Sequence, residues 1–77
     1  MNLREIFAFN LQLYRRAKGL SQEALAHEAG VDRAYLSAVE RSVNSATLDM
    51  VEKLSTVLGI EASVLLQRPR RQRRSPR

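Results

Sequence analysis

The chain has 77 residues, enough for one domain with a small core, and cores of that size are often supplemented by self-association. It contains no Cys, which excludes disulfides and thiolate metal sites, and its apolar runs are too short to span a bilayer. The formal net charge of +5 is uneven, because residues 68–77 hold six Arg and no acid. Residues 1–67 carry seven basic and eight acidic side chains, so charge alone does not predict a nucleic-acid partner.

Apolar residues recur at helical spacing along residues 1–67, and no run alternates with the period of a β-strand. The pattern predicts an all-α fold of five helices. In chain order, the expected helices cover residues 3–18, 21–29, 32–41, 47–58 and 62–67, with Ser21, Asp32 and Thr47 as N-caps. The first helix is apolar over a wide arc, with Leu3, Phe7, Leu11 and Tyr14 expected to face inward.

The composition changes abruptly after residue 67. The last ten residues, RPRRQRRSPR, hold two Pro and six Arg, and neither residue type at that density can form a packed face. We therefore predict one helical domain in residues 1–67 and a flexible arm in residues 68–77.

Residues 22–41 meet the steric demands of two short helices that cross steeply through a tight turn. Such a unit needs a small residue where the helices touch and a Gly where the chain reverses, which Ala26 and Gly30 supply. The apolar residues that would hold the second helix on the first are Leu25, Ala29, Val31, Leu36 and Val39. An ordinary helical hairpin would use the same core positions, but suitable residues at all seven of them favour a helix-turn-helix.

The outer side of the second helix in this unit carries short side chains and one long basic one. The outward set is Arg33, Ala34, Ser37 and Ala38. Such a face fits a major groove about 12 Å wide, whereas a merely solvated helix face would more often carry Glu and Lys. The pattern therefore predicts double-stranded DNA as a partner.

Residues 19–41, GLSQEALAHEAGVDRAYLSAVER, resemble the helix-turn-helix of lambda-repressor-like regulators of the xenobiotic-response-element (XRE) group. The resemblance extends over residues 6–66. Within the group, the pattern DRxYxSxxER of residues 32–41 is similar to the controller proteins of restriction–modification systems. The resemblance implies a five-helix DNA-binding domain in a transcriptional regulator.

The resemblance also implies DNA contacts at matching positions. The residues expected to face bases are Arg33, Ala34, Ser37 and Ala38. The residues expected at the DNA backbone or the groove edge are Arg16, Ser21, Gln22, Tyr35, Arg41, Asn44 and Thr47. Two alternatives stay open: Arg33 could contact a phosphate instead of a guanine, and Tyr35 could pack on the domain and donate its hydroxyl locally.

Arg15 and Glu40 match a pair that ties the first helix to the end of the recognition helix in the family, so we expect a structural role for both. The loop that follows departs from the family. Ser42, Asn44 and Ala46 stand where the family commonly has Gly, Arg and Pro. These departures leave the loop's DNA contacts and its stiffness open.

The last two predicted helices are richer in large apolar residues than a small core can bury, which indicates a partner surface. The resemblance implies a symmetric homodimer whose two recognition helices, about 34 Å apart, read a palindromic site. The residues expected at the dimer interface are Val57, Ile60, Val64 and Leu65.

The sequence thus predicts a sequence-specific, homodimeric transcriptional regulator in the cytoplasm, with no membrane partner. The alternative is a protein-interaction module, antitoxin-like or an adaptor, whose DNA binding is secondary. We find no paired carboxylates, phosphate loop or nucleophile–base pattern, so we expect no enzyme activity, no cofactor and no metal. The arm at 68–77 has three interpretations: added DNA contacts, an acidic partner, or vector-derived sequence.

Overall fold

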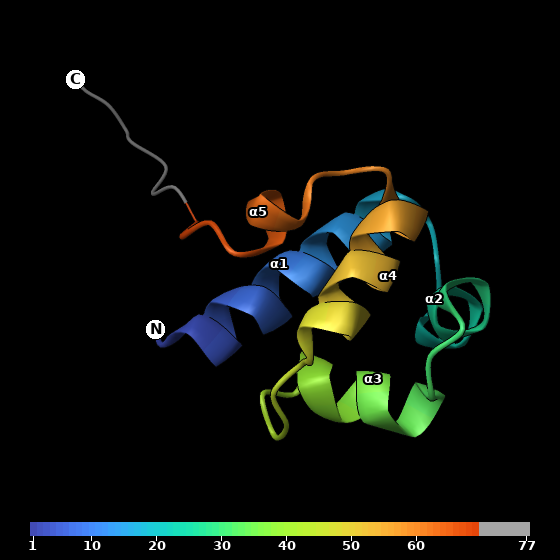
Figure 1. Cartoon of the computed structure of the whole chain (residues 1–77), viewed down its shortest axis with the longest axis horizontal. Coiled ribbons are helices and arrows are strands. Elements are labelled where there is room, and N and C mark those ends of the chain that lie inside the picture. Colours follow the sequence, from blue (N-terminus) through green and yellow to red (C-terminus); the bar gives the residue numbers. More distant parts are fainter. Residues whose placement is uncertain (70–77) are drawn as a thin grey trace.

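The computed structural model describes residues 1–69, and within them it contains five helices and no strand (Figure 1). The helices are α1 (Leu3–Ala17), α2 (Gln22–Ala29), α3 (Arg33–Glu40), α4 (Leu48–Leu58) and α5 (Ala62–Leu65). The all-α prediction is confirmed, although α5 ends two residues earlier than expected. In this part of the chain, no helix is long and apolar enough to cross a membrane.

Each of the first four helices begins at a side chain that caps it. Asn2 and Glu5 form a reciprocal capping box at the start of α1. Ser21, Asp32 and Thr47 cap α2, α3 and α4, and each accepts a hydrogen bond from the backbone N–H three residues further on. The caps expected at these three positions are therefore confirmed.

The same four helices end in a left-handed residue that turns the chain. Three of these residues are Gly, but α3 is followed by Ser42 with a φ of 63°. The turn after α3 is closed by two backbone bonds, from the Ser42 N–H to the Val39 carbonyl (3.0 Å) and from the Val43 N–H to the Ala38 carbonyl (2.9 Å). The loop between α3 and α4 therefore turns back over the last turn of α3.

The core lies where all five helices meet. Its buried members are Phe7, Leu11, Leu25, Ala26, Leu36, Val39, Met50, Val51, Leu54, Leu58 and Leu65. On α1 the inward face differs from the prediction, because Ile6 is buried while Leu3 is exposed. Ile6 is buried because α1 packs against both α3 and α5, so a wider arc of the helix is covered.

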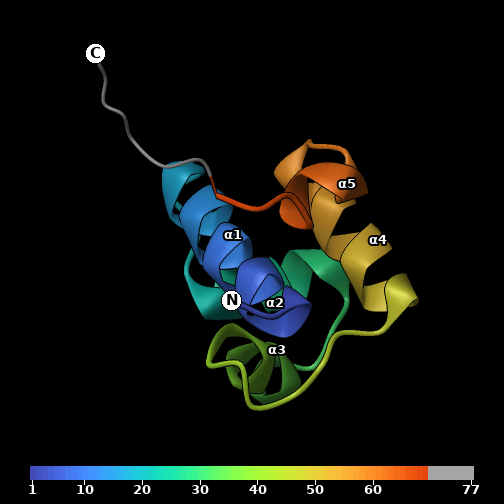
Figure 2. The same ribbon diagram turned by 90° about the vertical axis from the view of Figure 1, so that its left-hand side faces the viewer.

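A buried amide fastens α5 to α1. The Nδ2 group of Asn10 donates to the carbonyls of Leu65 (2.9 Å) and Gln67 (2.7 Å), just after the last turn of α5. Because these carbonyls have no partner within the helix, the Asn10 side chain serves as a cap supplied by another element. Figures 1 and 2 show that α5 lies at the opposite end of the domain from α3.

Candidate nucleic-acid interface

The helices α2 and α3 form a two-helix unit joined by a tight turn. Gly30 ends α2 with a φ of 70°, and the Val31 N–H then bonds to the Ala26 carbonyl at 2.9 Å. Leu25 and Leu36 hold the two helices together in the core. The predicted inner face is buried at Leu25, Leu36 and Val39, and half-buried against the same core at Ala29 and Val31.

The N-terminal end of α3 is the exposed end of this unit. Arg33 and Ala34 are exposed there, and Ser37 is half-buried one turn further along. The Arg33 guanidinium makes no ion pair with any group in residues 1–69, so its donors are available to an outside partner. A planar guanidinium with short neighbours can reach the edge of a base pair without steric hindrance.

Ala38 corrects the prediction that it is exposed on the outer side of α3. Its exposed fraction is 9%, and its carbonyl accepts bonds from the N–H groups of Val43 and Asn44. The cause is the loop after α3, which turns back at Ser42 and lies against this residue. The candidate base-reading face is therefore reduced to Arg33, Ala34 and Ser37.

The C-terminal end of α3 is fastened by a buried ion pair. The Arg15 Nε lies 2.7 Å from the Glu40 Oε2, and the Arg15 Nη2 lies 3.0 Å from the Oε1. The two side chains are 10% and 1% exposed, which confirms the predicted pair. A third guanidinium donor of Arg15 bonds to the Leu20 carbonyl at 2.8 Å, so this side chain binds both the end of α3 and the turn after α1.

Two glutamines complete this buried cluster. The Gln22 Nε2 donates to the Glu40 Oε1 at 2.9 Å, and the Gln12 Nε2 donates to the Glu40 carbonyl at 2.8 Å. Gln22 was expected to contact a phosphate, and its amide retains a second N–H that can do so. Sequence reasoning missed Gln12, for which the only signal was an amide within an apolar helix.

The remaining predicted backbone residues have varied surroundings. The Tyr35 hydroxyl donates to the Ser45 carbonyl, which is the local alternative left open by the sequence. Arg16, Arg41 and Asn44 are exposed. Ser21 and Thr47 are also exposed, but their hydroxyl oxygens already accept the capping bonds of α2 and α4.

The predicted dimer residues do not form an open face. Leu65 is 0% exposed, which corrects the expectation that it lies at an interface, because a four-residue helix packed on α1 and α4 turns this side chain fully inward. Val57 and Ile60 are half-buried and pack against the domain's own core, and Val64 is half-buried.

Two short crossed helices with an exposed arginine at the start of the second define a DNA-binding helix-turn-helix domain. The sequence agrees, because residues 11–65 match the helix-turn-helix family HTH_3. The chain belongs to this family of DNA-binding transcription regulators of the XRE type, as the sequence resemblance implied.

Relatives and solved structures support this membership. A hypothetical transcription factor of Neisseria meningitidis is 46% identical over 68 residues, which are 88% of this chain and 64% of that protein. The crystal structure of a hypothetical transcription factor from Neisseria gives a TM-score of 0.85 over 88% of this chain and 78% of that one. The chain therefore spans less than two thirds of the length of the Neisseria meningitidis relative.

Two further solved structures are similar. The restriction–modification controller protein C.AhdI from Aeromonas hydrophila is 44% identical, with a TM-score of 0.77 over 80% of this chain and 94% of that one. The Bacillus subtilis regulator SinR, in a complex with DNA, is 35% identical, with a TM-score of 0.77 over 79% of this chain and 98% of that one. The resemblance to restriction–modification controllers is thus confirmed.

Proposed function

We propose that this chain is a sequence-specific transcriptional regulator that binds a palindromic operator as a homodimer, with α3 in the major groove, in the cytoplasm. The observation that carries the proposal is the contrast on α3 between an exposed Arg33 and a buried, fully paired Glu40. The similarity to SinR, which was solved in complex with DNA, supports DNA binding by this chain. Regulation then follows from occupation of the operator.

In this proposal each exposed residue of α3 has a separate task. Arg33 makes a bidentate contact with guanine O6 and N7, while Ala34 offers only apolar contact, for instance to a thymine methyl. Ser37 is placed one turn further along to accept or donate a single hydrogen bond. Gln22 donates its second N–H to a phosphate, and Arg41 neutralises a phosphate beyond the end of α3.

The remaining backbone positions fix the register rather than the sequence. Arg16, Asn44 and Thr47 would meet phosphates at the edges of the site, while Ser21 and Tyr35 contribute through the backbone they hold in place. Tyr35 does so by keeping the α3–α4 loop close to α3 through its bond to the Ser45 carbonyl.

The Arg-rich segment supplies charge that the folded part lacks. The predicted arm begins at residue 68, and its residues 70–77 lie outside the described part of the chain. We assign it to phosphate contacts, so deleting residues 68–77 should flatten the salt dependence of DNA binding by up to about 5 units of slope. The preferred sequence should stay the same; a changed preference would show that the segment reads bases or groove shape.

Selection from random double-stranded DNA tests the proposal. We expect enrichment of a palindrome whose half-sites lie about 10 base pairs or a multiple of that apart, together with a dimeric mass by light scattering at micromolar concentrations. Recovery of an unrepeated half-site with a monomeric mass would overturn the homodimer. A lack of any enrichment, combined with stable co-purification of another protein, would instead favour the interaction module.

A further inference from the structure

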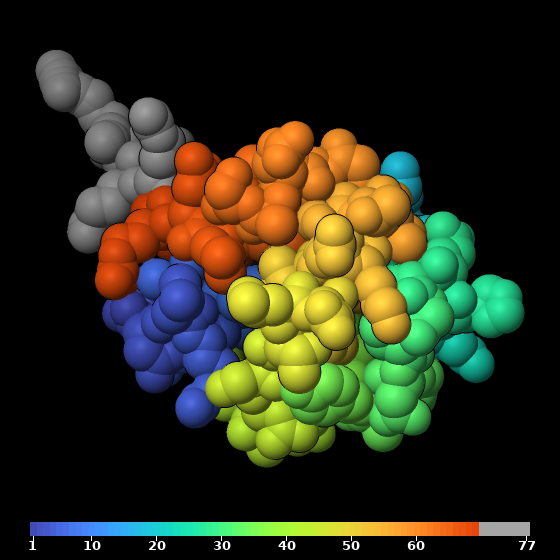
Figure 3. All heavy atoms as spheres, in the orientation of Figure 1, coloured from blue at the N-terminus to red at the C-terminus, as the bar shows by residue number. Residues whose placement is uncertain are grey.

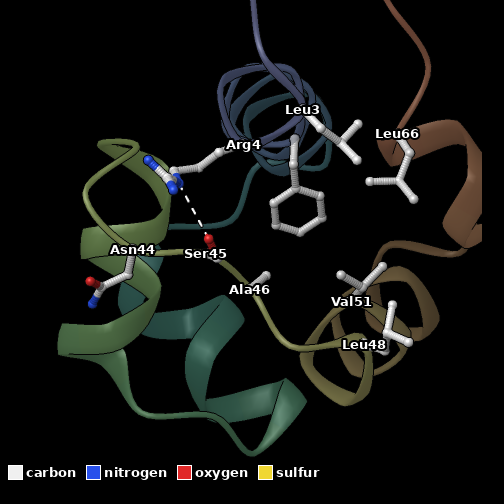
Figure 4. A pocket seen from close by; sticks show the side chains of 9 residues that line it. Leu3, Arg4, Asn44, Ser45, Ala46, Leu48, Val51 and Leu66 are labelled. Carbon is white, nitrogen blue, oxygen red and sulfur yellow. Dashed lines mark hydrogen bonds between the residues drawn. The ribbon is translucent and has the colours of Figure 1, made fainter.

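A side chain from the start of α1 reaches across to the α3–α4 loop. The Arg4 Nε donates to the Ser45 Oγ at 3.2 Å, although the two residues are 41 positions apart in the chain. Figure 4 shows this bond at the edge of an apolar hollow, where the Arg4 side chain extends over the loop and away from Leu3 and Leu66. The bond therefore holds a guanidinium group of α1 against the loop.

The loop that Arg4 reaches lies beside the recognition helix. The Tyr35 hydroxyl of α3 donates to the carbonyl of Ser45, the same residue whose side chain bonds to Arg4. The Asn44 N–H bonds to the Ala38 carbonyl of α3 at 3.4 Å. Figure 3 shows the start of α1 (blue), the loop (yellow-green) and α3 (green) next to one another on one face. Ser45 thus connects α1 to α3.

Arg4 brings a positive charge to a loop that has none in its central residues. Residues 42–46 are Ser, Val, Asn, Ser and Ala, so none of them is charged. Arg4 itself is exposed and forms no ion pair within residues 1–69. Its bond to Ser45 engages only the Nε donor. The charge and the two terminal amino groups of the guanidinium therefore remain available to an outside partner.

The bond to Ser45 also limits the motion of the Arg4 side chain. A long side chain that becomes fixed on binding loses conformational entropy, which weakens the complex. Because the Arg4 guanidinium is already bonded in the free protein, part of that loss occurs before a partner arrives. An anchored arginine is thus better prepared for binding than an unanchored one on the same surface.

The position of this guanidinium indicates the partner. A helix in a major groove about 12 Å wide lies between two phosphate backbones. Groups within one side-chain length of such a helix face phosphates, and Ser45, which is bonded to Tyr35 of α3, lies at that distance. Arg4 is the cation held at this position. A planar guanidinium can bind two phosphate oxygens at once, which suits this surrounding.

We propose that Arg4 is a DNA-phosphate contact carried on α1, and that Ser45 is its positioning residue. The terminal amino groups of Arg4 bind a phosphate at the border of the groove that α3 enters, while the Ser45 Oγ holds the guanidinium through its Nε. The inference rests on the proposed DNA binding and adds a contact from outside the helix-turn-helix. The contact raises affinity for all sequences alike and leaves base selection to α3.

The salt dependence of DNA binding tests the phosphate contact. Arg4→Gln removes one positive charge, and Lys53→Gln is the matched control on α4. Both side chains are exposed and form no ion pair within residues 1–69, so both variants should fold as the wild type does. On a duplex with a single half-site, Arg4→Gln should reduce the salt slope by about 0.9, which corresponds to about 8-fold weaker binding at about 0.1 M salt. Lys53→Gln should keep the wild-type slope.

The choice of DNA separates this inference from the proposed homodimer. Arg4→Gln should cause the same loss on an unrelated duplex as on the half-site, because a phosphate contact is independent of sequence. On the full palindrome a homodimer presents Arg4 twice, so the slope should fall by about 1.8. An equal fall on palindrome and half-site would contradict the homodimer and still place Arg4 at a phosphate. An unchanged slope on every duplex would overturn the inference, and a wild type that binds no DNA would overturn the proposed function with it.

Two further variants separate the charge of Arg4 from its orientation. Arg4→Lys should restore the wild-type salt slope, because an ammonium also neutralises a phosphate. An Arg4→Lys variant with the slope of Arg4→Gln would overturn the phosphate contact, since the charge would then have no effect.

Ser45→Ala tests the positioning role. It should keep the salt slope and weaken binding about 3-fold, because the Arg4 side chain must then be ordered on the DNA. The double variant Arg4→Gln/Ser45→Ala should bind as Arg4→Gln does, since no guanidinium remains to be oriented. Losses that add in full in the double variant would overturn the role of Ser45 as the positioning residue.

Discussion

The two ends of α3 differ in almost every physical respect. At the C-terminal end, Glu40 is buried and accepts bonds from Arg15 and Gln22. At the N-terminal end, Arg33 is exposed and has no charged partner in the described part of the chain. One end of the helix is therefore held by the protein, and the other is left free for an outside partner.

This difference shows how a nearly neutral domain can present a DNA-reading helix. The charge that fixes the helix is removed from solvent and neutralised internally, so it contributes nothing to attraction for phosphates. In the proposed function, the charge that reads DNA is concentrated on the Arg33 side chain. Affinity and specificity would then be separable, because the fixed end would determine the angle of α3 and the free end would select the base.

Breaking the ion pair that holds the C-terminal end of α3 should have the largest effect on stability. Glu40→Ala leaves the Arg15 guanidinium buried without a counter-charge, which should cost about 3–5 kcal/mol of folding free energy. The melting temperature should fall by at least about 12 °C for a domain of this size. The double variant Arg15→Met/Glu40→Met should regain much of that loss, because no buried charge remains. An unchanged melting temperature for Glu40→Ala would contradict the role assigned to this pair.

Truncating Arg33 at the free end of α3 should weaken DNA binding and leave the stability of the domain unchanged. Arg33→Ala should lower affinity for the selected operator by about 1–3 kcal/mol, the value of a bidentate contact with guanine. Its melting temperature should match that of the wild type, because the Arg33 side chain is exposed and forms no ion pair within residues 1–69. Titrations with operator and with unrelated DNA give the measurement. An equal loss on both would reassign Arg33 to a phosphate contact.

The sequence predicted the elements of both ends. The caps at Ser21, Asp32 and Thr47 and the pairing of Arg15 with Glu40 all follow local patterns or fixed spacings in the family, which depend little on the rest of the fold. A cap requires only a side-chain oxygen before a helical run. The caps are therefore readable from a few consecutive residues, whereas the pairing of Arg15 with Glu40, 25 residues apart, was expected only from the family resemblance.

The errors arose where the outcome depends on how separate elements pack. Ala38 is buried because the loop after α3 turns back at Ser42 and covers it. The family pattern gave no reason to expect this path of the loop. Leu65 is buried because α5 packs on α1 and α4. The sequence did not predict this, because α5 has only four residues, too few for helical periodicity to identify an inward face. The bond from Gln22 to Glu40 was likewise not foreseen, because Glu40 is 18 residues away in the chain, although the expected phosphate contact of Gln22 stays a prediction.

A substitution of Gly30, in the turn between α2 and α3, should have a smaller effect on stability. Gly30 has a φ of 70°, and a Cβ added there would meet no atom within 4 Å. Gly30→Ala should therefore cost about 1 kcal/mol through backbone strain alone. Gly30→Asn should cost less, because Asn tolerates the left-handed region better. Urea unfolding of the two variants gives the comparison, and equal losses would point to a steric cause instead.

A substitution in the turn after the C-terminal end of α3 should increase the stability of the domain, and this is the smallest effect that we predict. Ser42 holds a φ of 63°, a conformation that strains any residue with a Cβ, so Ser42→Gly relieves that strain. The greater freedom of Gly in the unfolded chain offsets part of the gain, which leaves about 0.5 kcal/mol of added stability. Ser45→Gly in the same loop is the matched control, because Ser45 is not left-handed and its hydroxyl accepts a bond from Arg4. Ser45→Gly should therefore destabilise the domain. If both variants lose stability in urea, then Ser42 is held by contacts that outweigh its strain, and the fixed end of α3 extends into the loop.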